Sequence, residues 1–310
     1  MYNDRSIYIL GFGAIGKALG VHLALSGRQV VIVRATGQSD PDAMTRVRMH
    51  GTDNNMLEAH LRVTSLTGLS ELDGLVVLAN KSFGNAQLAE KLRNKIGDSP
   101  IVLLQNGLGV EEPFMTEFFR EIYRCVLFVT AQNISENEVR FKPVTTCPVG
   151  IEKGRREALA EVVKQLDTPG FRFVPHDDIK TVVWRKAIVN SVFNSICPLL
   201  EVDNGIFHRN DAALAIARSV IAECAAVARA EGVMIEEREA EEMLLQISRS
   251  SDGQLISTYQ DILAGRPTEI ETLNLQIAKC ASRADPALPV VRTGLLGELI
   301  RLKEEVKMRQ

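Results

Sequence analysis

The sequence predicts an α/β domain built on a parallel sheet, followed by an all-α domain. Short apolar runs alternate with helical patterns over about the first 150 residues, whereas strand signals nearly disappear after about residue 176. The length of 310 residues also fits two domains. We therefore expect one domain over residues 1–175 and a second over residues 176–310.

The composition is that of a globular protein. Of its residues 45% are hydrophobic and 24% are charged, and the formal net charge is −3, which excludes a disordered chain and a dominant nucleic-acid footprint. No apolar tract is long enough for a membrane span, and the first residues do not resemble a signal peptide. We therefore expect a cytoplasmic protein with neither membrane nor nucleic-acid partners. The five cysteines and five histidines lack CxxC and HxxxH spacing, so neither disulfides nor a metal site are expected.

The elements of the first domain follow from its apolar runs. A run at Ser6–Leu10 is followed by a helical pattern over Ala14–Ser26, and Gly27 stands where a glycine ends a helix. Further buried strands are expected at Gln29–Val33, Leu75–Ala79 and Ile101–Leu104. Continuous apolar strands that are joined by helices predict a parallel sheet covered on both faces.

Beyond residue 124 the pattern changes twice. Strands with short connections, suggestive of an antiparallel extension, are expected over residues 126–130, 139–141 and 144–151. Asp177 or Asp178 can then cap a helix that runs to about Ile196. Later helical patterns cover residues 212–232, 236–248, 253–264, 267–283 and 290–305.

A glycine-rich motif directly follows the first expected strand and opens the first helix. It reads Gly11-Phe12-Gly13-Ala14-Ile15-Gly16, a GxGxxG pattern. Its glycines allow a tight turn, close approach of the backbone to a pyrophosphate, and close helix–strand packing. The motif also occurs as a plain structural turn. Here the strand–turn–helix–strand context favours a dinucleotide site and a Rossmann-type fold for this domain.

The end of the second expected strand indicates which dinucleotide binds. The run Val30-Val31-Ile32-Val33 ends in Arg34, and no acidic residue follows until Asp40. NAD enzymes place an acid there for the ribose 2′-hydroxyl, whereas a cation suits the 2′-phosphate of NADP(H). We therefore predict NADP(H), the alternative being a solvated arginine at a strand end.

Three polar residues recur every four positions on an otherwise apolar helix. Lys186, Asn190 and Asn194 form one narrow stripe, and a stripe on a buried helix must find polar partners. A cleft for a polar substrate would supply them, although a solvent-facing stripe is the alternative. A partly buried lysine could act as a general acid. With a hydride donor, such a lysine would suit the reduction of a ketone.

Four further residues are weaker candidates. Lys81 and Asn106-Gly107 each follow an expected strand, where open α/β sheets place ligand contacts. A surface lysine and a simple Asn-Gly turn are the alternatives. Ser257 and Glu269 lie on helices that are otherwise rich in leucine and isoleucine, and taken alone they would more often be surface residues.

Taken in order along the whole chain, these motifs resemble the ketopantoate reductase (2-dehydropantoate 2-reductase) family. The matching stretches are the GxGxxG motif, Ala79-Asn80-Lys81-Ser82, Leu104-Gln105-Asn106-Gly107-Leu108-Gly109, Trp184-Arg185-Lys186 with Asn190 and Asn194, Asn204-Gly205, and Ser257 to Asp261 with Thr268-Glu269-Ile270-Glu271. The resemblance implies a Rossmann domain followed by a helical domain, with the active site in the cleft between them. It implies NADPH-dependent reduction of 2-dehydropantoate to (R)-pantoate in pantothenate biosynthesis, with a 2-oxo acid as substrate. The oligomeric state is left open between a monomer and a homodimer.

The resemblance also implies roles for individual residues. Lys186 would be the general acid, and Glu269 would position the substrate through its hydroxyl group. Substrate binding would fall to the polar residues Asn106, Asn190, Asn194 and Ser257. The cofactor would be bound by the residues Gly11, Phe12, Gly13, Ala14, Ile15, Gly16, Arg34, Lys81, Asn106 and Glu269.

The sequence departs from the family pattern in places, and other functions stay open. Arg124-Cys125-Val126 stands where relatives often have a glycine, and Asn274-Leu275 stands where Asn-Gly is usual. A reductase of another 2-oxo acid or a β-hydroxyacid dehydrogenase is an alternative, although the Ser-Gly-Gly loop of the latter is missing. A non-catalytic NADP(H)-binding regulator is a third, but it would not need Lys186 as a proton donor.

Overall fold

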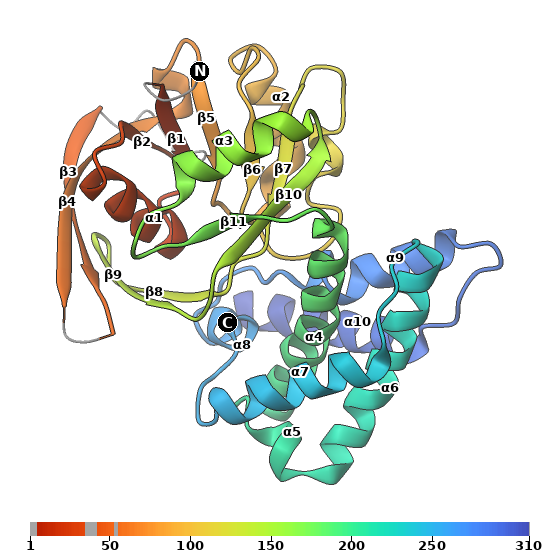
Figure 1. Cartoon of the computed structure of the whole chain (residues 1–310). Coiled ribbons are helices and arrows are strands. Elements are labelled where there is room, and N and C mark those ends of the chain that lie inside the picture. The colour runs from red at the N-terminus through yellow and green to blue at the C-terminus, as the bar shows by residue number, and fades with distance from the viewer. Residues whose placement is uncertain (1–4, 35–41, 53–54, 310) are drawn as a thin grey trace. The chain divides into compact units, whose positions relative to one another are not determined.

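Figure 1 shows the computed structural model of the chain, which describes residues 5–34, 42–52 and 55–309. The chain forms two compact units. The first spans residues 1–105 and 110–179, and the second spans residues 106–109 and 180–310. The short segment 106–109 therefore belongs by its contacts to the helical unit, although it lies within the sequence of the first unit.

A single sheet organises the described part of the first unit. Its strand order is β11-β10-β7-β6-β5-β1-β2-β4-β3-β9-β8. The central strands, from β7 to β4 in that order, all run parallel, and the apolar runs predict four of them: β1, β2, β5 and β6. They are β1 (Ser6–Leu10), β2 (Val30–Arg34), β4 (Met56–Ser65), β5 (Gly74–Leu78), β6 (Ile101–Leu103) and β7 (Ile122–Cys125).

Helices cover both faces of this sheet and bury a core on each. Helices α1 (Ala14–Leu25) and α3 (Arg156–Leu166) pack on one face, where Ile7 and Ile9 of β1 point. Helix α2 (Asn85–Leu92) packs on the other face against Leu10, Val76 and Leu78. The alternation of neighbouring strand residues between the two cores explains why these strands are apolar throughout.

The edges of the sheet differ from the sequence prediction. The observed strands are β3 (Ala43–His50), β8 (Val129–Ser135), β9 (Glu138–Pro143), β10 (Cys147–Lys153) and β11 (Phe173–Pro175). The strands expected at 126–130, 139–141 and 144–151 are therefore displaced by up to a few residues, and the antiparallel pairing of β10 with β7 and of β8 with β9 is present. Strands β3, β4, β7 and β11 were not expected from the sequence. Along β3 and β4, charged residues alternate with apolar ones and leave no continuous apolar run.

The second unit is helical in its described residues, as predicted. Its helices are α4 (Ile179–Leu200), α5 (Ile206–Arg209), α6 (Asp211–Ala230), α7 (Glu237–Ser250), α8 (Ser257–Leu263), α9 (Asn274–Arg283) and α10 (Val291–Met308). Two expected helices are shorter than their patterns. Gly253 and Gly265 adopt positive φ angles of 74° and 61°, and α8 lies between these two turns. Only a 3₁₀ turn, Ile270–Thr272, lies between Pro267 and α9.

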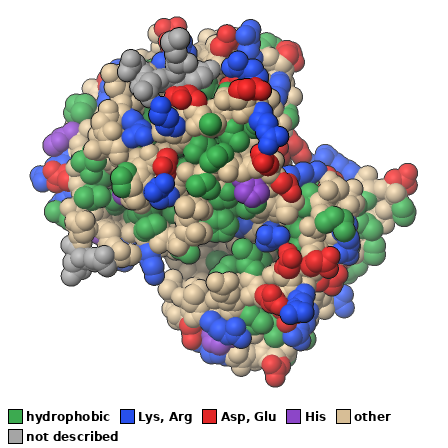
Figure 2. All heavy atoms as spheres, in the orientation of Figure 1, with side chains coloured by type: hydrophobic (Ala, Val, Ile, Leu, Met, Phe, Trp, Pro, Cys, Tyr) green, Lys and Arg blue, Asp and Glu red, His purple; other side chains and the backbone are tan. Residues whose placement is uncertain are grey.

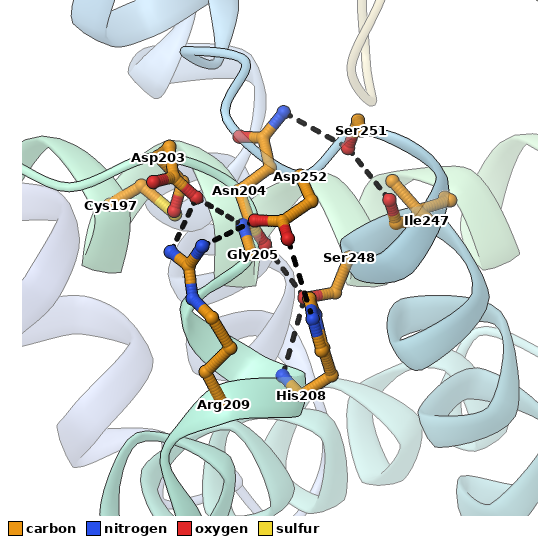
Figure 3. A network of polar contacts seen from close by, with 10 residues as sticks. All are labelled: Cys197, Asp203, Asn204, Gly205, His208, Arg209, Ile247, Ser248, Ser251 and Asp252. Atoms are coloured by element: carbon orange, nitrogen blue, oxygen red, sulfur yellow. Dashed lines mark hydrogen bonds and ion pairs between the residues drawn. The ribbon is translucent and has the colours of Figure 1, made fainter.

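The Asn204-Gly205 pair that contributes to the family resemblance has a structural role in this unit (Figure 3). The hydroxyl of Ser248 at the end of α7 donates to the backbone oxygen of Asn204 over 2.7 Å. Arg209 of α5 pairs with Asp252, and a Cβ on Gly205 would lie 1.9 Å from Oδ1 of Asp252. A larger residue at this position would therefore have to displace the Asp252 and Arg209 side chains.

Charged side chains of both signs are interspersed on the face seen in Figure 2. Lysine and arginine do not gather there into a separate block, in keeping with the net charge of −3.

Candidate active site

The glycine-rich loop has the shape that a dinucleotide site requires. Gly11 has φ +125°, and a Cβ there would lie 2.7 Å from the backbone nitrogen of Asn80. A Cβ on Gly16 would lie 2.0 Å from the backbone oxygen of Gly11, so both positions demand glycine. Around Gly13 a Cβ would meet nothing within 4 Å. No side chain caps α1 at Gly13, so the loop and the helix N-terminus fit a bound pyrophosphate.

Two cations gather at the aromatic residue of this loop. The Arg34 guanidinium carbon and the Lys17 Nζ each lie 5.0 Å from the centroid of the Phe12 ring. Lys17 is only 3% exposed, and its Nζ donates to the backbone oxygen of Glu136 over 2.7 Å. Burial lowers the pKa of Lys17, whereas Glu136 acts in the opposite direction. The Glu136 carboxylate also lies 3.6 Å from the Arg34 guanidinium. This places positive charge beside the loop, as a phosphate-bearing ligand needs.

Sequence reasoning missed Lys17 and Glu136. Lys17 looks like an ordinary helical lysine, although its place one residue after the GxGxxG motif was a usable signal. Glu136 lies between β8 and β9, and it contacts Arg34 from more than 100 residues away in the sequence. Only the pairing of β9 with β3 at the sheet edge carries this hairpin there, and no local pattern predicts that pairing.

Lys81 lies where the sequence predicts it, in the loop after β5. It is half-buried and immediately precedes a short 3₁₀ helix, Ser82–Gly84. The side chain of Asn80 donates to the backbone oxygen of Lys81 over 2.9 Å. Since β5 and β2 both pair with β1, Lys81 and Arg34 follow two strands that flank the glycine-rich loop. This is the edge at which open parallel sheets bind ligands.

A buried polar network holds both ends of the segment 106–109. The amides of Asn85 and Gln105 exchange two hydrogen bonds of 2.8 Å each, and Asn85 also donates to the backbone oxygen of Val110 over 2.8 Å. Arg124, which is 1% exposed, donates to the backbone oxygen of Gln105 over 2.8 Å and lies 3.6 Å from Glu111. Burial lowers the pKa of Arg124, while the negative charge of Glu111 opposes that shift. The network therefore fixes the residues on either side of Asn106.

Replacing Arg124 by Met is expected to lower the free energy of unfolding by about 1–3 kcal/mol, because the change leaves a buried carbonyl oxygen without its donor. Urea unfolding measures the change. Arg120→Met removes a neighbouring arginine whose side chain is 70% exposed, and it should change the stability by less than about 0.5 kcal/mol. Equal stability of the two variants would contradict a clamping role for Arg124.

The predicted catalytic residues form a hydrogen-bonded chain within the second unit. The half-buried Lys186 donates from Nζ to Oδ1 of Asn106 over 2.9 Å. The Nδ2 group of the same amide donates to Oε2 of Glu269 over 3.3 Å. One amide thus bridges an ammonium and a carboxylate, which fixes the direction in which it points. The structure brings together Lys186, Asn106 and Glu269, which are far apart in the sequence.

Tight backbone packing explains why Asn106 lies beside Glu269. Gly107 has φ +94°, and a Cβ there would lie 2.3 Å from Oγ1 of Thr272. The next residue, Leu108, donates its backbone N–H to the backbone oxygen of Thr272 over 2.7 Å. The hydroxyl of Thr272 in turn donates to the backbone oxygen of Glu269 over 3.1 Å. The Asn-Gly pair is therefore a close contact with the turn that carries Glu269.

The other two residues of the polar stripe on α4 are Asn190 and Asn194, and Asn194 also contacts the start of α8. Asn190 is half-buried on α4, one turn beyond Lys186. Asn194 is 3% exposed and donates from Nδ2 to the backbone oxygen of Asn190 over 2.9 Å. Its Oδ1 accepts from the Ser257 hydroxyl and from the Thr258 N–H, each over 3.4 Å. Asn194 therefore anchors the start of α8, while Ser257 itself is exposed.

The predicted residues divide between the two units. The cofactor candidates Gly11 to Gly16, Arg34 and Lys81 lie in the first unit. The second unit holds Asn106, Lys186, Asn190, Asn194, Ser257 and Glu269. Among the residues that the structure describes, no three acidic, histidine or cysteine side chains gather as a metal site would require. Within the same residues, every helix is too short or too polar to cross a membrane.

Known proteins match nearly the whole length of this chain. The family model described as Ketopantoate reductase PanE/ApbA matches residues 7–151, and its C-terminal counterpart matches residues 178–304. A 2-dehydropantoate 2-reductase of Pyrococcus horikoshii is 29% identical over 302 residues, which cover 97% of this chain and 98% of that protein.

Solved structures show the same fold. A D-mandelate dehydrogenase with NADH and anilino(oxo)acetate superposes with a TM-score of 0.86 at 22% identity, covering 97% of this chain and 99% of the other. A dimeric ketopantoate reductase from Staphylococcus aureus superposes with a TM-score of 0.79 at 19% identity and the same coverage. At these identities the superpositions establish a shared fold.

Proposed function

Because the chain belongs to the ketopantoate reductase family, we propose that it reduces 2-dehydropantoate to (R)-pantoate with NADPH, a step of pantothenate biosynthesis. The observation that carries the proposal is the hydrogen-bonded chain Lys186–Asn106–Glu269. It supplies a proton donor, an orienting amide and a carboxylate in one place. The reduction of a 2-oxo acid needs a proton at the carbonyl oxygen, and Lys186 is the residue that provides it.

Each member of the chain has a distinct task. The Lys186 ammonium hydrogen-bonds the ketone oxygen, stabilises the negative charge that develops there and transfers its proton. The amide oxygen Oδ1 of Asn106 accepts a hydrogen bond from that ammonium. Because this acceptor is neutral, the lysine is oriented without forming a tight ion pair. Glu269 accepts from Asn106 and has a further oxygen with which it can hold a substrate hydroxyl. Such preorganised groups act mainly in the transition state.

The first unit holds the nicotinamide cofactor in this proposal. When bound, NADPH supplies the hydride. The backbone around Gly13 and the first turn of α1 hold the pyrophosphate, while Arg34 and Lys81 face the adenosine end and its 2′-phosphate. The Lys17 ammonium adds buried positive charge beside the same loop. The substrate would meet the cofactor in the cleft that the family resemblance implies.

The test is NADPH oxidation, followed by absorbance, against a panel of 2-oxo acids. The panel contains 2-dehydropantoate, other branched 2-oxo acids and phenylglyoxylate, which is the 2-oxo acid that corresponds to mandelate. The highest kcat/KM with 2-dehydropantoate is expected. A higher value with phenylglyoxylate would favour the alternative of another 2-oxo acid, and no turnover with any compound would favour a regulator.

Ser257→Ala is expected to lower kcat/KM for the 2-oxo acid by about three- to tenfold, since one neutral hydrogen bond contributes about 0.5–1.5 kcal/mol. Asn194→Ala should do the same and also lower the melting temperature, because Asn194 anchors α8. NADPH affinity, measured by fluorescence, should stay near that of the wild type for both. A collapse of cofactor affinity would place these residues in the nucleotide site or the fold.

The partner we propose for the chain, besides its 2-oxo acid, is a second copy of itself. A family member from Staphylococcus aureus with the same fold is described as dimeric.

A further inference from the structure

The short segment that carries Glu269 packs against the last helix. Glu269 is half-buried, whereas its neighbours Thr268 and Ile270 are only 6% and 1% exposed. Ile270 lies in a small apolar core together with Ile300 of α10. Ile300 and Glu304 are four positions apart, so they lie on the same face of that helix. The face of α10 that contacts one neighbour of Glu269 therefore also carries a carboxylate.

The carboxylate of Glu304 contacts the other neighbour of Glu269. Its Oε2 accepts from the backbone N–H of Thr268 over 2.9 Å and from the Thr268 hydroxyl over 2.6 Å. The same hydroxyl accepts from the backbone N–H of Ile270 over 3.4 Å. Because the half-buried Glu304 takes two donors from one residue, it fixes both the backbone and the side chain of Thr268. Helix α10 thus restrains the backbone immediately before and immediately after Glu269.

A restraint on this backbone is also a restraint on the Glu269 carboxylate. The N–H and the hydroxyl of Thr272 both donate to the backbone oxygen of Glu269 over 3.1 Å. The side chain itself is held less tightly, since the hydrogen bond from Asn106 to its Oε2 is 3.3 Å long. Groups that bind a substrate must be held to within about half an ångström by the residues behind them. The contacts at Thr268 and Thr272 supply that support.

We propose that Glu304 is a positioning residue, which acts through Thr268 to hold Glu269 where that carboxylate binds the substrate hydroxyl. The inference rests on the proposed function, in which Glu269 has this task. Loss of Glu304 therefore weakens the selection of 2-oxo acids that carry a hydroxyl group, while Lys186 still donates its proton. A residue with a purely structural role would instead affect all substrates alike.

Two substrates that differ only in the hydroxyl test the proposal. Trimethylpyruvate is 2-dehydropantoate without its hydroxyl group, so the ratio of kcat/KM for 2-dehydropantoate to kcat/KM for trimethylpyruvate reports the hydroxyl contact. Glu304→Ala is expected to lower this ratio by about three- to tenfold, the effect of weakening one hydrogen bond to the substrate. Glu304→Gln keeps an oxygen that can accept both Thr268 donors, so it should restore the ratio. Glu305→Ala, an exposed change at the next position of α10, should leave the ratio unchanged.

Two further variants test the route through which Glu304 acts. In a chain that already carries Glu269→Ala, Glu304→Ala should no longer lower the ratio. Thr268→Val removes only the hydroxyl donor and should lower the ratio in the same direction, which keeps the test available if Glu304→Ala does not fold. The proposal is overturned by an unchanged ratio in Glu304→Ala or Thr268→Val, even if both substrates are then reduced more slowly. A further fall of the ratio in the Glu269→Ala chain would also overturn it.

Hydrogen exchange separates this proposal from the proposed function, because it does not depend on turnover. The peptide that covers residues 268–273 should exchange faster in Glu304→Ala than in the wild type or in Glu305→Ala. Unchanged exchange would overturn the positioning role. A wild type that reduces neither substrate would overturn the proposed function, and faster exchange in Glu304→Ala would then still support the hold of Glu304 on this segment.

Discussion

Replacing Lys186 by Met is expected to lower kcat by about 10²–10⁴-fold, the usual contribution of a general acid. The methionine keeps most of the length of the side chain and removes only the ammonium, so packing on α4 changes little. Stabilising the developing alkoxide matters mainly in the transition state, so kcat and kcat/KM should both fall. Steady-state NADPH oxidation with 2-dehydropantoate measures both constants.

Lys180→Met serves as the matched control. Lys180 lies on the same helix, and its Nζ donates to the backbone oxygen of Glu231 over 2.6 Å, away from Asn106. It should keep kcat within a few-fold of the wild type. NADPH affinity should survive both changes, because Lys186 and Lys180 lie outside the unit that carries the glycine-rich loop. If Lys186→Met folds, binds NADPH and turns over like Lys180→Met, the proton donor is another residue.

Local patterns were sufficient for the parts of the fold in which one short stretch determines the structure. The GxGxxG motif predicts a turn whose glycines are required, and Gly11 and Gly16 are indeed hemmed in by backbone atoms. The i, i+4 stripe predicts which face of α4 carries polar groups, and Lys186 and Asn106 meet on that face. The continuous apolar runs predict a sheet that is buried on both sides.

Features that depend on contacts distant in sequence were not predictable in this way. Arg124 looks like a departure from a glycine pattern, yet it is buried and fixes Gln105 through a hydrogen bond to its backbone. The stripe residue Asn194 turned out to serve as an anchor for α8 as well. Nothing in the local sequence around any of these residues reports its partner, because each partner is brought close only by the packing of other elements.

Replacing Arg34 by Ala is expected to raise the Kd for NADPH by about ten- to a hundredfold and to leave the Kd for NADH nearly unchanged. A hydrogen bond between charged groups contributes about 1.5–3 kcal/mol, and only NADPH has the 2′-phosphate that would make it. Binding is measured by nucleotide fluorescence, so the result does not depend on turnover. Lys142→Ala, an exposed change on β9, is the control that should alter neither constant.

Glu136 gives a second variant for the same binding measurement. Its carboxylate lies 3.6 Å from the Arg34 guanidinium, on an exposed side chain, and a bound 2′-phosphate would have to compete with it for that cation. Glu136→Gln removes a negative charge that competes for Arg34 and repels the 2′-phosphate. It should therefore lower the Kd for NADPH, while NADH binds no better. If Arg34→Ala weakens both nucleotides equally, Arg34 supports the loop through Phe12 and does not recognise the phosphate. If Glu136→Gln tightens NADH instead, the carboxylate is not a competitor for the phosphate, and the preference for NADPH arises elsewhere in the site.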